Sequence, residues 1–185
     1  AVNAADQILK LRQILCGVVK VPNTDKYEVL DHAPRLQALL ECIEQARSKV
    51  FVIVPFKGII QTLADEVAQH YSCEVLNGDV SQTKRDEIIT RFKTVDDPRV
   101  LLCHPKVVSH GLNLTEADTM VFFAPIYSND EFLQSIERFN RPGQKHKMTV
   151  IKLGSHKLEW QLYASLENKK KMQETILDMY TEIVG

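Results

Sequence analysis

Short, uninterrupted apolar runs are the feature of this sequence that most constrains its fold. They cover Lys49–Pro55, Val100–His104 and Thr119–Ala124, with residues at helical spacing between them. Such a run is typical of a strand buried on both faces, which requires helices above and below the sheet. Strands that alternate with helices pair mostly in parallel. The sequence therefore predicts an α/β fold, a three-layer α/β/α sandwich with a mostly parallel central sheet.

The segment before the first run has its own pattern. Leu and Ile residues at helical spacing predict a helix over 6–16, and β-rich runs on either side of the turn residues Pro22–Asp25 predict a hairpin. The other predicted elements are strands over 73–76 and 149–153 and helices over 34–46, 58–70, 81–92, 129–140 and 157–180.

No repeat or linker divides the chain. We expect a single domain over 1–185, with an N-terminal helix and hairpin extension over 1–31 and a closing C-terminal helix over 157–185. We also expect it to be an excised or processed part of a longer protein.

Charge and cysteine content narrow the class of protein. The 23 basic and 24 acidic residues give a formal charge of −1, which argues against a dedicated, strongly basic nucleic-acid binder. No apolar run approaches the roughly 18 residues of a membrane span, so we expect no membrane partner. The 4 cysteines are widely spaced, as expected for free thiols in a reducing compartment and not for a metal site. The sequence predicts an intracellular domain.

Several motifs of nucleotide chemistry are absent. The chain has no G-x-x-x-x-G-K-[ST] phosphate loop, no G-x-G-x-x-G and no acidic pair after a strand that would hold magnesium. This argues against a self-contained nucleotide hydrolase. If this domain takes part in nucleotide chemistry, another domain or protein must supply the phosphate-binding part of the site.

The densest group of polar residues lies on the helix predicted over 129–140. Gln134, Arg138 and Arg141 stand at i, i+4 and i+7, so they project from one face, and Pro142-Gly143 ends the helix. Planar guanidinium groups with several donors suit phosphate oxygens. The alternative is that these arginines form surface ion pairs with Asp130, Glu131 and Glu137.

Two further stretches carry candidate ligand-binding residues. In S-H-G-L-N-L-T-E-A-D, starting at Ser109, Gly111 allows close backbone approach and Asn113 offers both a donor and an acceptor. In N-G-D-V-S-Q-T-K-R, starting at Asn77, a strand leads into a helix capped by Ser81, whose N-terminus can meet an anion. The alternatives are an ordinary connection and a normally capped, solvated helix.

Taken in order, these patterns resemble the second RecA-like lobe of superfamily-two helicases and translocases. Pro55-Phe56-Lys57 resembles motif IV, the stretch from Asn77 resembles H-G-D-x-x-Q-x-x-R, and the stretches from Ser109 and Gln134 resemble motifs V and VI. The forms G-L-N-L-T and R-x-G-Q are typical of the Swi/Snf-like branch. The flanks resemble that branch too, through L-x-L-R-x-I near the start and the helix after residue 156. The chain departs from the family where Ser109-His110 replaces Gly-Gly and where Pro142 follows the second arginine.

The resemblance implies a composite ATPase site. In this family ATP and Mg²⁺ lie between two lobes, and the first lobe, a partner from the same polypeptide, supplies the phosphate loop and the magnesium ligands. Arg138 and Arg141 are then arginine fingers, Gln134 positions them, and Gly111 and Asn113 lie at the ATP cleft. The isolated chain is expected to be inactive.

The resemblance also implies contacts with a nucleic-acid backbone, most simply that of double-stranded DNA. The residues assigned to these contacts are Lys57, Gly78, Gln82, Arg85, Ser109 and His110. The compact chain favours a prokaryotic or viral source and a cytoplasmic location; a eukaryotic source would place it in the nucleus. The alternatives are a lobe of a DEAD-box RNA helicase and a non-catalytic binding module that uses Lys169–Lys171.

Overall fold

Within the part of the chain that the structure describes, the central sheet has five strands, all parallel. The computed structural model describes residues 2–108, 115–140 and 147–168, with side chains described from residue 6. Hydrogen bonds join the strands in the order β4-β5-β3-β6-β7, and each neighbouring pair is parallel. The strands are β3 (Lys49–Ile53), β4 (Cys73–Leu76), β5 (Val100–Cys103), β6 (Ala117–Phe122) and β7 (Thr149–Lys152). The predicted parallel sheet is confirmed.

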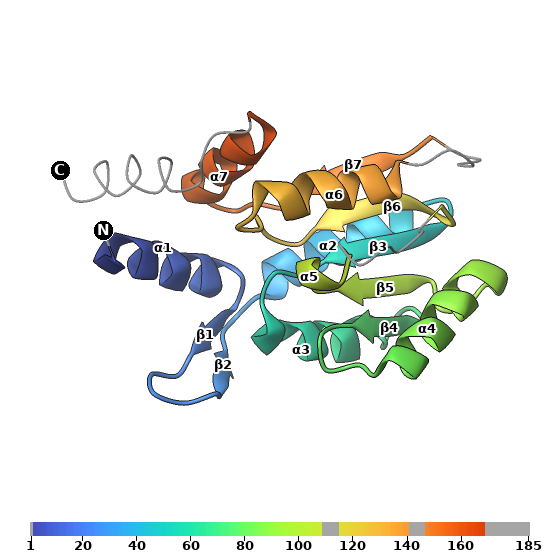
Figure 1. Ribbon diagram of the computed structural model, residues 1–185, viewed down its shortest axis with the longest axis horizontal. Helices are drawn as coiled ribbons and strands as arrows, with labels where there is room; N and C mark the ends of the chain where they lie inside the picture. The colour runs from blue at the N-terminus through green and yellow to red at the C-terminus, as the bar shows by residue number, and fades with distance from the viewer. Residues whose placement is uncertain (1, 109–114, 141–146, 169–185) are drawn as a thin grey trace.

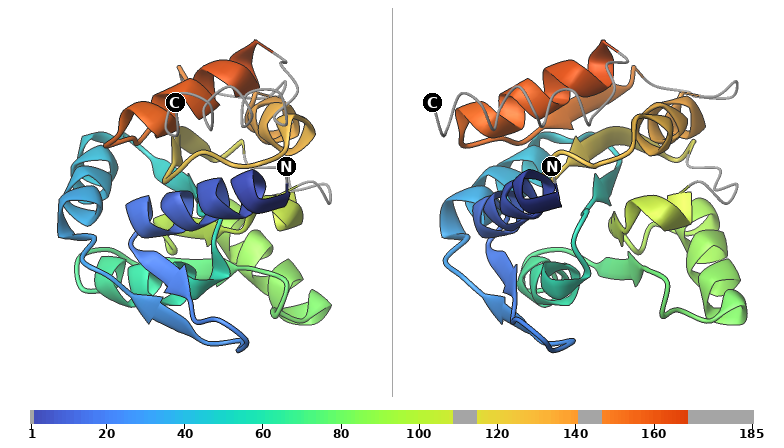
Figure 2. Two further views of the ribbon diagram at one scale, coloured as in Figure 1. Left: turned by 90° about the vertical axis from the view of Figure 1, so that its left-hand side faces the viewer. Right: turned by 60° about the vertical axis from the view of Figure 1, so that its left-hand side comes forward.

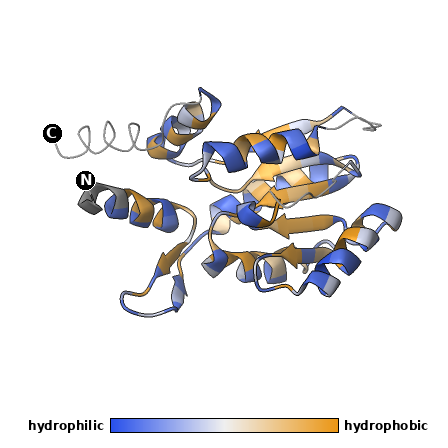
Figure 3. Cartoon of the chain, viewed as in Figure 1, coloured by the Kyte–Doolittle hydropathy of each residue, from blue (hydrophilic) through white to orange (hydrophobic). Residues whose placement is uncertain are grey.

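Helices cover both faces of this sheet (Figures 1 and 2). Because strand side chains alternate, Phe51 and Ile53 of β3 enter one apolar core and Val50 and Val52 enter the other. The second core contains α2 (Ala33–Gln45) and α3 (Lys57–Val67); the first contains α4 (Gln82–Thr94), α5 (Pro105–Val108), α6 (Asn129–Phe139) and α7 (Lys157–Glu167). Apolar strands lie between helices with polar outer faces (Figure 3). The three-layer prediction is also confirmed.

The N-terminal segment forms a separate helix and hairpin, α1 (Val2–Leu15), β1 (Val18–Lys20) and β2 (Tyr27–Val29). The hairpin strands are antiparallel, with Val18 opposite Val29. Gly17 joins α1 to β1 at φ +84°, a conformation that side chains oppose, and a Cβ there would lie 2.4 Å from the Cβ of His32. Figure 1 shows α1 beside the carboxyl ends of the strands and the hairpin beside α3.

Most element boundaries differ from the sequence prediction by one to four residues, and the start of β6 and the helix α5 have consequences for the fold. The structure starts β6 at Ala117, so the polar pair Asp118 and Thr119 lies inside a buried strand. The Asp118 carboxylate accepts hydrogen bonds from the Ser48 backbone N–H at 3.0 Å and from the Thr119 hydroxyl at 2.9 Å. The short helix α5 was not predicted. Helix α7 begins at Lys157 as predicted, and residues 169–180 of that prediction lie outside the described residues.

Within the described part of the chain, no helix is both long and apolar enough to cross a membrane. The four cysteines are free thiols, two of them buried and two half-buried. Burial raises the pKa of Cys16 and of Cys73 to about 12, so both thiols stay protonated at neutral pH.

Candidate functional site

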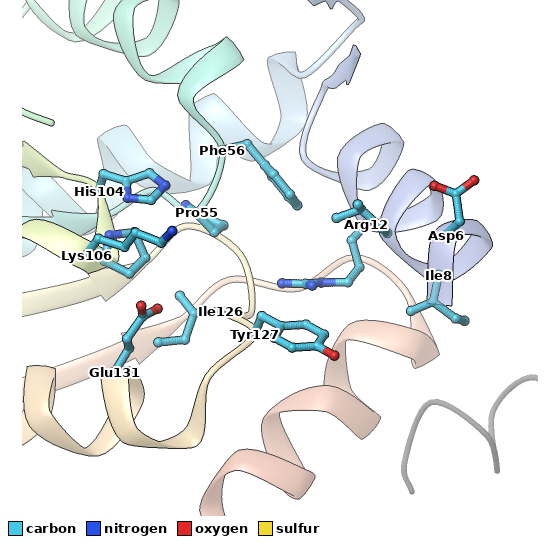
Figure 4. A pocket seen from close by; sticks show the side chains of 12 residues that line it. Asp6, Ile8, Arg12, Pro55, Phe56, His104, Lys106, Ile126, Tyr127 and Glu131 are labelled. Atoms are coloured by element: carbon cyan, nitrogen blue, oxygen red, sulfur yellow. The ribbon is translucent and has the colours of Figure 1, made fainter. Parts of the chain in front are cut away.

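The strand order creates a switch point at β3. The connection after β3 leads to α3 on one face of the sheet, whereas those after its neighbours β5 and β6 lead to α5 and α6 on the other face. Parallel sheets bind ligands in the crevice outside such a point. A pocket of about 560 Å³ lies there (Figure 4). Its lining includes Arg12, Phe56, His104, Lys106, Tyr127 and Glu131.

Arg12 holds α1 against this edge of the sheet. Its side chain is only 4% exposed, and its Nη2 donates a hydrogen bond to the Pro125 carbonyl at 2.6 Å. The guanidinium lies over the rings of Phe56 and Tyr127, at 5.6 and 5.9 Å from their centroids. Burial lowers the pKa of Arg12. The Nε–H of Arg12 has no hydrogen-bond partner among the described residues.

His104, Lys106 and Glu131 stand on the opposite wall of the pocket. Burial lowers the pKa of His104, and the nearby positive charges of Lys106 and Lys57 lower it further. Burial raises the pKa of Glu131 in the first turn of α6, and Lys106 opposes that change. Lys106 is therefore close enough to both side chains to affect their protonation.

Lys57 and Gly78, two predicted nucleic-acid-binding residues, lie side by side. The Lys57 Nζ forms an ion pair with Asp79 at 2.8 Å, and a Cβ on Gly78 would lie 3.7 Å from that Nζ. The side chain of Asn77 accepts the Asp79 backbone N–H at 2.9 Å and shapes this turn. A groove of about 580 Å³ between α3 and α4 includes Lys57, Asp79 and Lys84 in its lining.

The predicted residues Gln82 and Arg85 lie in the first turn of α4. Ser81 caps this helix as predicted, since its hydroxyl accepts the backbone N–H of Lys84 at 3.4 Å. Gln82 donates to the Asp86 carboxylate at 2.9 Å, and Arg85 is half-buried. Both residues therefore follow the turn at Gly78 and Asp79 within a few positions along the chain.

Gln134 and Arg138 share one face of α6, as predicted. Gln134 is exposed and Arg138 is half-buried, whereas Phe132, Ser135 and Phe139 fill the buried face. The ion pairs found among the described residues do not include Arg138, so the surface ion pair considered as an alternative is not seen there.

Helix α6 separates these residues from the pocket. Because β6 and β7 are parallel, α6 carries the chain from the carboxyl edge of the sheet back toward its amino edge. Arg138, in the last turn of α6, therefore lies toward the other end of the helix from Glu131. The predicted site residues Ser109, His110, Gly111, Asn113 and Arg141 lie outside the described residues.

A buried ion pair that sequence reasoning missed joins α2 to α7. Arg35 and Glu159 are 7% and 1% exposed, and their charged atoms lie 2.6 Å apart. Arg35 also donates to the Phe123 carbonyl at 2.6 Å, and Glu159 accepts the Ser155 backbone N–H at 2.8 Å. The two charged residues are 124 positions apart, and no local pattern links them. Arg12 was noted within L-x-L-R-x-I, but no contact was predicted for it.

The fold and this arrangement of loops define a RecA-like α/β domain. The C-terminal part of the Fun30 ATPase domain superposes with a TM-score of 0.68 at 19% identity, covering 80% of this chain and 53% of that one. The C-terminal domain of the DEAD-box protein Dbp5 gives 0.64 at 17% identity, covering 75% and 79%. At these identities the likeness concerns the fold.

Sequence comparison then identifies the family. The model of the helicase conserved C-terminal domain matches residues 34–143, and the chain belongs to this family. This confirms that the chain is a helicase C-terminal domain, as the resemblance described above implies.

Curated relatives support this assignment. An uncharacterized ATP-dependent helicase of Mycoplasma genitalium is 28% identical over 92% of the chain. The TATA-binding protein-associated factor mot1 of Aspergillus fumigatus is 30% identical over 66% of the chain. A chromodomain-helicase-DNA-binding protein 1-like of Danio rerio is 28% identical over 77% of it. The chain spans 17%, 8% and 14% of these three relatives' lengths.

Proposed function

We propose that this chain is the second motor lobe of an ATP-dependent DNA translocase or helicase. In this proposal it completes an ATPase site whose phosphate loop lies on a first RecA-like lobe of the same polypeptide. Residues 1–185 act as one lobe, with 1–31 as an extension that docks on it and 157–185 as a closing helix.

The observation that carries the proposal is the geometry of α6. One face of this helix is held in the core by Phe132, Ser135 and Phe139, so the opposite face presents Gln134 and Arg138 from a rigid support. A guanidinium fixed in this way suits the negative charge that develops on a transferred phosphoryl group. Arg138 and Arg141 are proposed as arginine fingers, Gln134 as the residue that positions them, and Gly111 and Asn113 as neighbours of the ATP.

The described side chains fit the phosphate end of ATP better than its metal ion. Arg138 offers guanidinium donors, and Gln134 offers an amide on the same face. Among the described residues, no group of three or more His, Cys, Asp and Glu side chains could hold a metal ion. As the family resemblance implies, the proposal assigns the Mg²⁺ ligands to the first lobe, where the ion would neutralise phosphate charge.

The turn after β4 and the start of α4 support the proposed nucleic-acid contacts. Lys57 and Gly78 adjoin each other, and Gln82 and Arg85 follow on the next helix. Contacts of a cation and an open backbone with phosphates give affinity without reading sequence, which suits a motor that moves along DNA. Ser109 and His110 are proposed to extend this surface.

Substitution of the proposed fingers tests the ATPase role. In the full-length protein, Arg138→Ala and Arg141→Ala should each lower DNA-stimulated ATPase by about a thousandfold, because arginine fingers contribute at least that much. Duplex-DNA affinity should change little. Lys93→Ala, an exposed lysine in the last turn of α4, is the matched control and should leave both unchanged. ATPase that persists in both arginine variants would show the assignment to be wrong.

A further inference from the structure

The pocket at the switch point is separate from the proposed ATP face. It opens between α1 and the residues that follow β3, β5 and β6, whereas Arg138 stands toward the opposite end of α6 from the pocket residue Glu131. Its volume of about 560 Å³ falls within the roughly 300–1,000 Å³ range of small-molecule sites. It is therefore large enough for a ligand of mononucleotide size.

The charged groups of this pocket favour an anion. Arg12 is buried and its Nε–H lacks a hydrogen-bond partner among the described residues; Figure 4 shows its guanidinium directed between the pocket walls. A buried donor without a partner is costly, so an acceptor at this point would be bound favourably. Lys106 adds a cationic donor from the loop after β5, and the neutral imidazole of His104 lines the same wall. The carboxylates of Asp6 and Glu131 also line the pocket, and Lys106 lies close enough to Glu131 to affect its pKa.

The remaining walls favour a flat, largely apolar group. Phe56 and Ile126 line the pocket, and so does Tyr127, which is 50% exposed despite its contact with Arg12. An exposed aromatic side chain next to cations provides a surface on which a planar ring can stack. The pocket thus combines an anion-binding side with an aromatic side.

From these features we propose a second ligand site in this lobe, formed by Arg12, His104, Lys106, Phe56 and Tyr127. It takes a small ligand that carries a phosphate group and an aromatic ring, as a mononucleotide does. The phosphate binds near Arg12 and Lys106, and the ring stacks against the aromatic wall. Because the site includes α1 and the loops after three strands, its ligand holds the N-terminal helix against the sheet.

Calorimetric titration of the 185-residue chain with AMP tests the proposal. Adenosine, which lacks the anion, and inorganic phosphate, which lacks the ring, are the matched probes. Both should bind at least tenfold more weakly than AMP, because each loses one side of the site. Absence of AMP binding up to millimolar concentration, or equal affinity for AMP and adenosine, would overturn the proposal.

Variants of the chain locate the bound AMP. Lys106→Ala should weaken AMP binding about tenfold, and Tyr127→Ala about fivefold. Lys84→Ala, an exposed lysine in the groove between α3 and α4, is the matched control and should have no effect. AMP binding is also measured in Arg138→Ala, because this variant removes the guanidinium of the proposed ATP face. AMP binding that is lost in Arg138→Ala but retained in the Lys106 and Tyr127 variants would place the ligand on that face and overturn the second site.

Discussion

At the scale of single residues, two buried charged side chains join α2 to α7. Arg35 of α2 and Glu159 of α7 satisfy each other and also bond to backbone groups. A buried pair of this kind contributes little net stability compared with apolar residues, but removing one partner leaves the other charged and unpaired. The position of α7 on the sheet therefore depends on both residues.

Glu159→Ala should lower the free energy of unfolding by about 3–5 kcal/mol, because Arg35 would then be buried without a counter-charge. Glu167→Ala is the control in the same helix: the exposed carboxylate of Glu167 pairs with Lys152, and its loss should cost less than about 1 kcal/mol. Urea denaturation of the two variants measures both values. Equal, small losses would show that Arg35 finds other partners.

The protonation of His32 links the fold to pH. Its Nδ1 lies 2.9 Å from the Leu30 carbonyl and its Nε2 lies 2.7 Å from the Glu66 carboxylate, so both ring nitrogens face acceptors. Burial lowers the pKa of His32, but the hydrogen bonds to Leu30 and Glu66 outweigh it and raise the pKa above its ordinary value of 6.5. The charged imidazole therefore stabilises the folded state. This contribution is complete below the unfolded-state pKa and is lost as pH rises through the folded-state pKa.

We expect the stability difference between the unsubstituted chain and His32→Asn to be larger near about pH 6 than near about pH 8.5. Comparison with His32→Asn removes the contributions of other titrating groups, including His104, whose pKa shifts the other way. Denaturation curves at a series of pH values measure the difference. Glu66→Gln should flatten the dependence. A difference that grows with pH would contradict the charged-imidazole interpretation.

Sequence reasoning located the residues of α6 and α4 because their spacing is local, but it could not locate Arg12, Arg35 or Glu159 as structural contacts. Arg12 reaches a carbonyl 113 positions away, and Arg35 reaches a carboxylate 124 positions away. The local periodicity of a sequence carries no information on contacts between residues so far apart along the chain. Three loops that line the pocket follow the carboxyl ends of strands, where a parallel sheet is expected to bind ligands, but the contribution of α1 to the pocket was not predicted.

At the scale of elements, the strands and long helices were predictable and some of their limits were not. A continuous apolar run identifies a buried strand, and this pattern located β3 and β5 to within a few residues. The predicted start of β6 at Thr119 was wrong because Asp118 is a residue type typical of loops. The backbone N–H of Ser48 donates a hydrogen bond to the Asp118 carboxylate, which allows Asp118 to lie in a buried strand. Helix α5 is too short for periodicity to detect.

The hairpin can pack closely on α3 because residue 58 is a glycine and has no side chain. The ring of Tyr27 in β2 lies against Gly58, so close that a Cβ on Gly58 would be 2.4 Å from the ring. Alanine otherwise stabilises a helix by roughly 0.5–1 kcal/mol relative to glycine. The tyrosine ring therefore reverses the usual preference at this position.

Gly58→Ala should destabilise the chain when Tyr27 is present and stabilise it in the Tyr27→Ala background. This sign change follows because the clash exists only when the ring is there. A double-mutant cycle by urea denaturation measures it. A Gly58→Ala effect of the same sign in both backgrounds would mean that the hairpin moves aside at no cost.

At the scale of the whole molecule, the lobe is one half of the proposed motor. Arg138 on α6 and Lys57 at the start of α3 belong to the same domain. The proposal places the phosphate loop of the ATPase site on the first lobe, which is not part of this chain. The competing interpretations are a DEAD-box RNA helicase lobe and a non-catalytic binding module. They differ in which nucleic acid, if any, activates the complete protein.

The ATPase of the full-length protein should therefore be stimulated by duplex DNA, and the 185-residue chain should be inactive under the same conditions. Phosphate release without nucleic acid, with duplex DNA and with RNA measures this. Stimulation by RNA alone would favour the DEAD-box interpretation, and no ATPase under any condition would favour the binding module. Activity of the chain by itself would refute the composite site.

The contacts of α1 and α7 have a practical consequence for anyone who trims this protein to its family boundaries. A recombinant piece covering 34–143 would remove the guanidinium that covers Phe56 and bonds to the Pro125 carbonyl, and the tyrosine that covers Gly58. It would also remove Glu159 and leave Arg35 without its carboxylate. Such a piece would expose the apolar surface that α1 and the hairpin cover, and it would leave the Arg35 guanidinium without a counter-charge. It would therefore be prone to aggregate. The smallest sensible unit for expression includes all of α1 and α7, which carry Arg12 and Glu159.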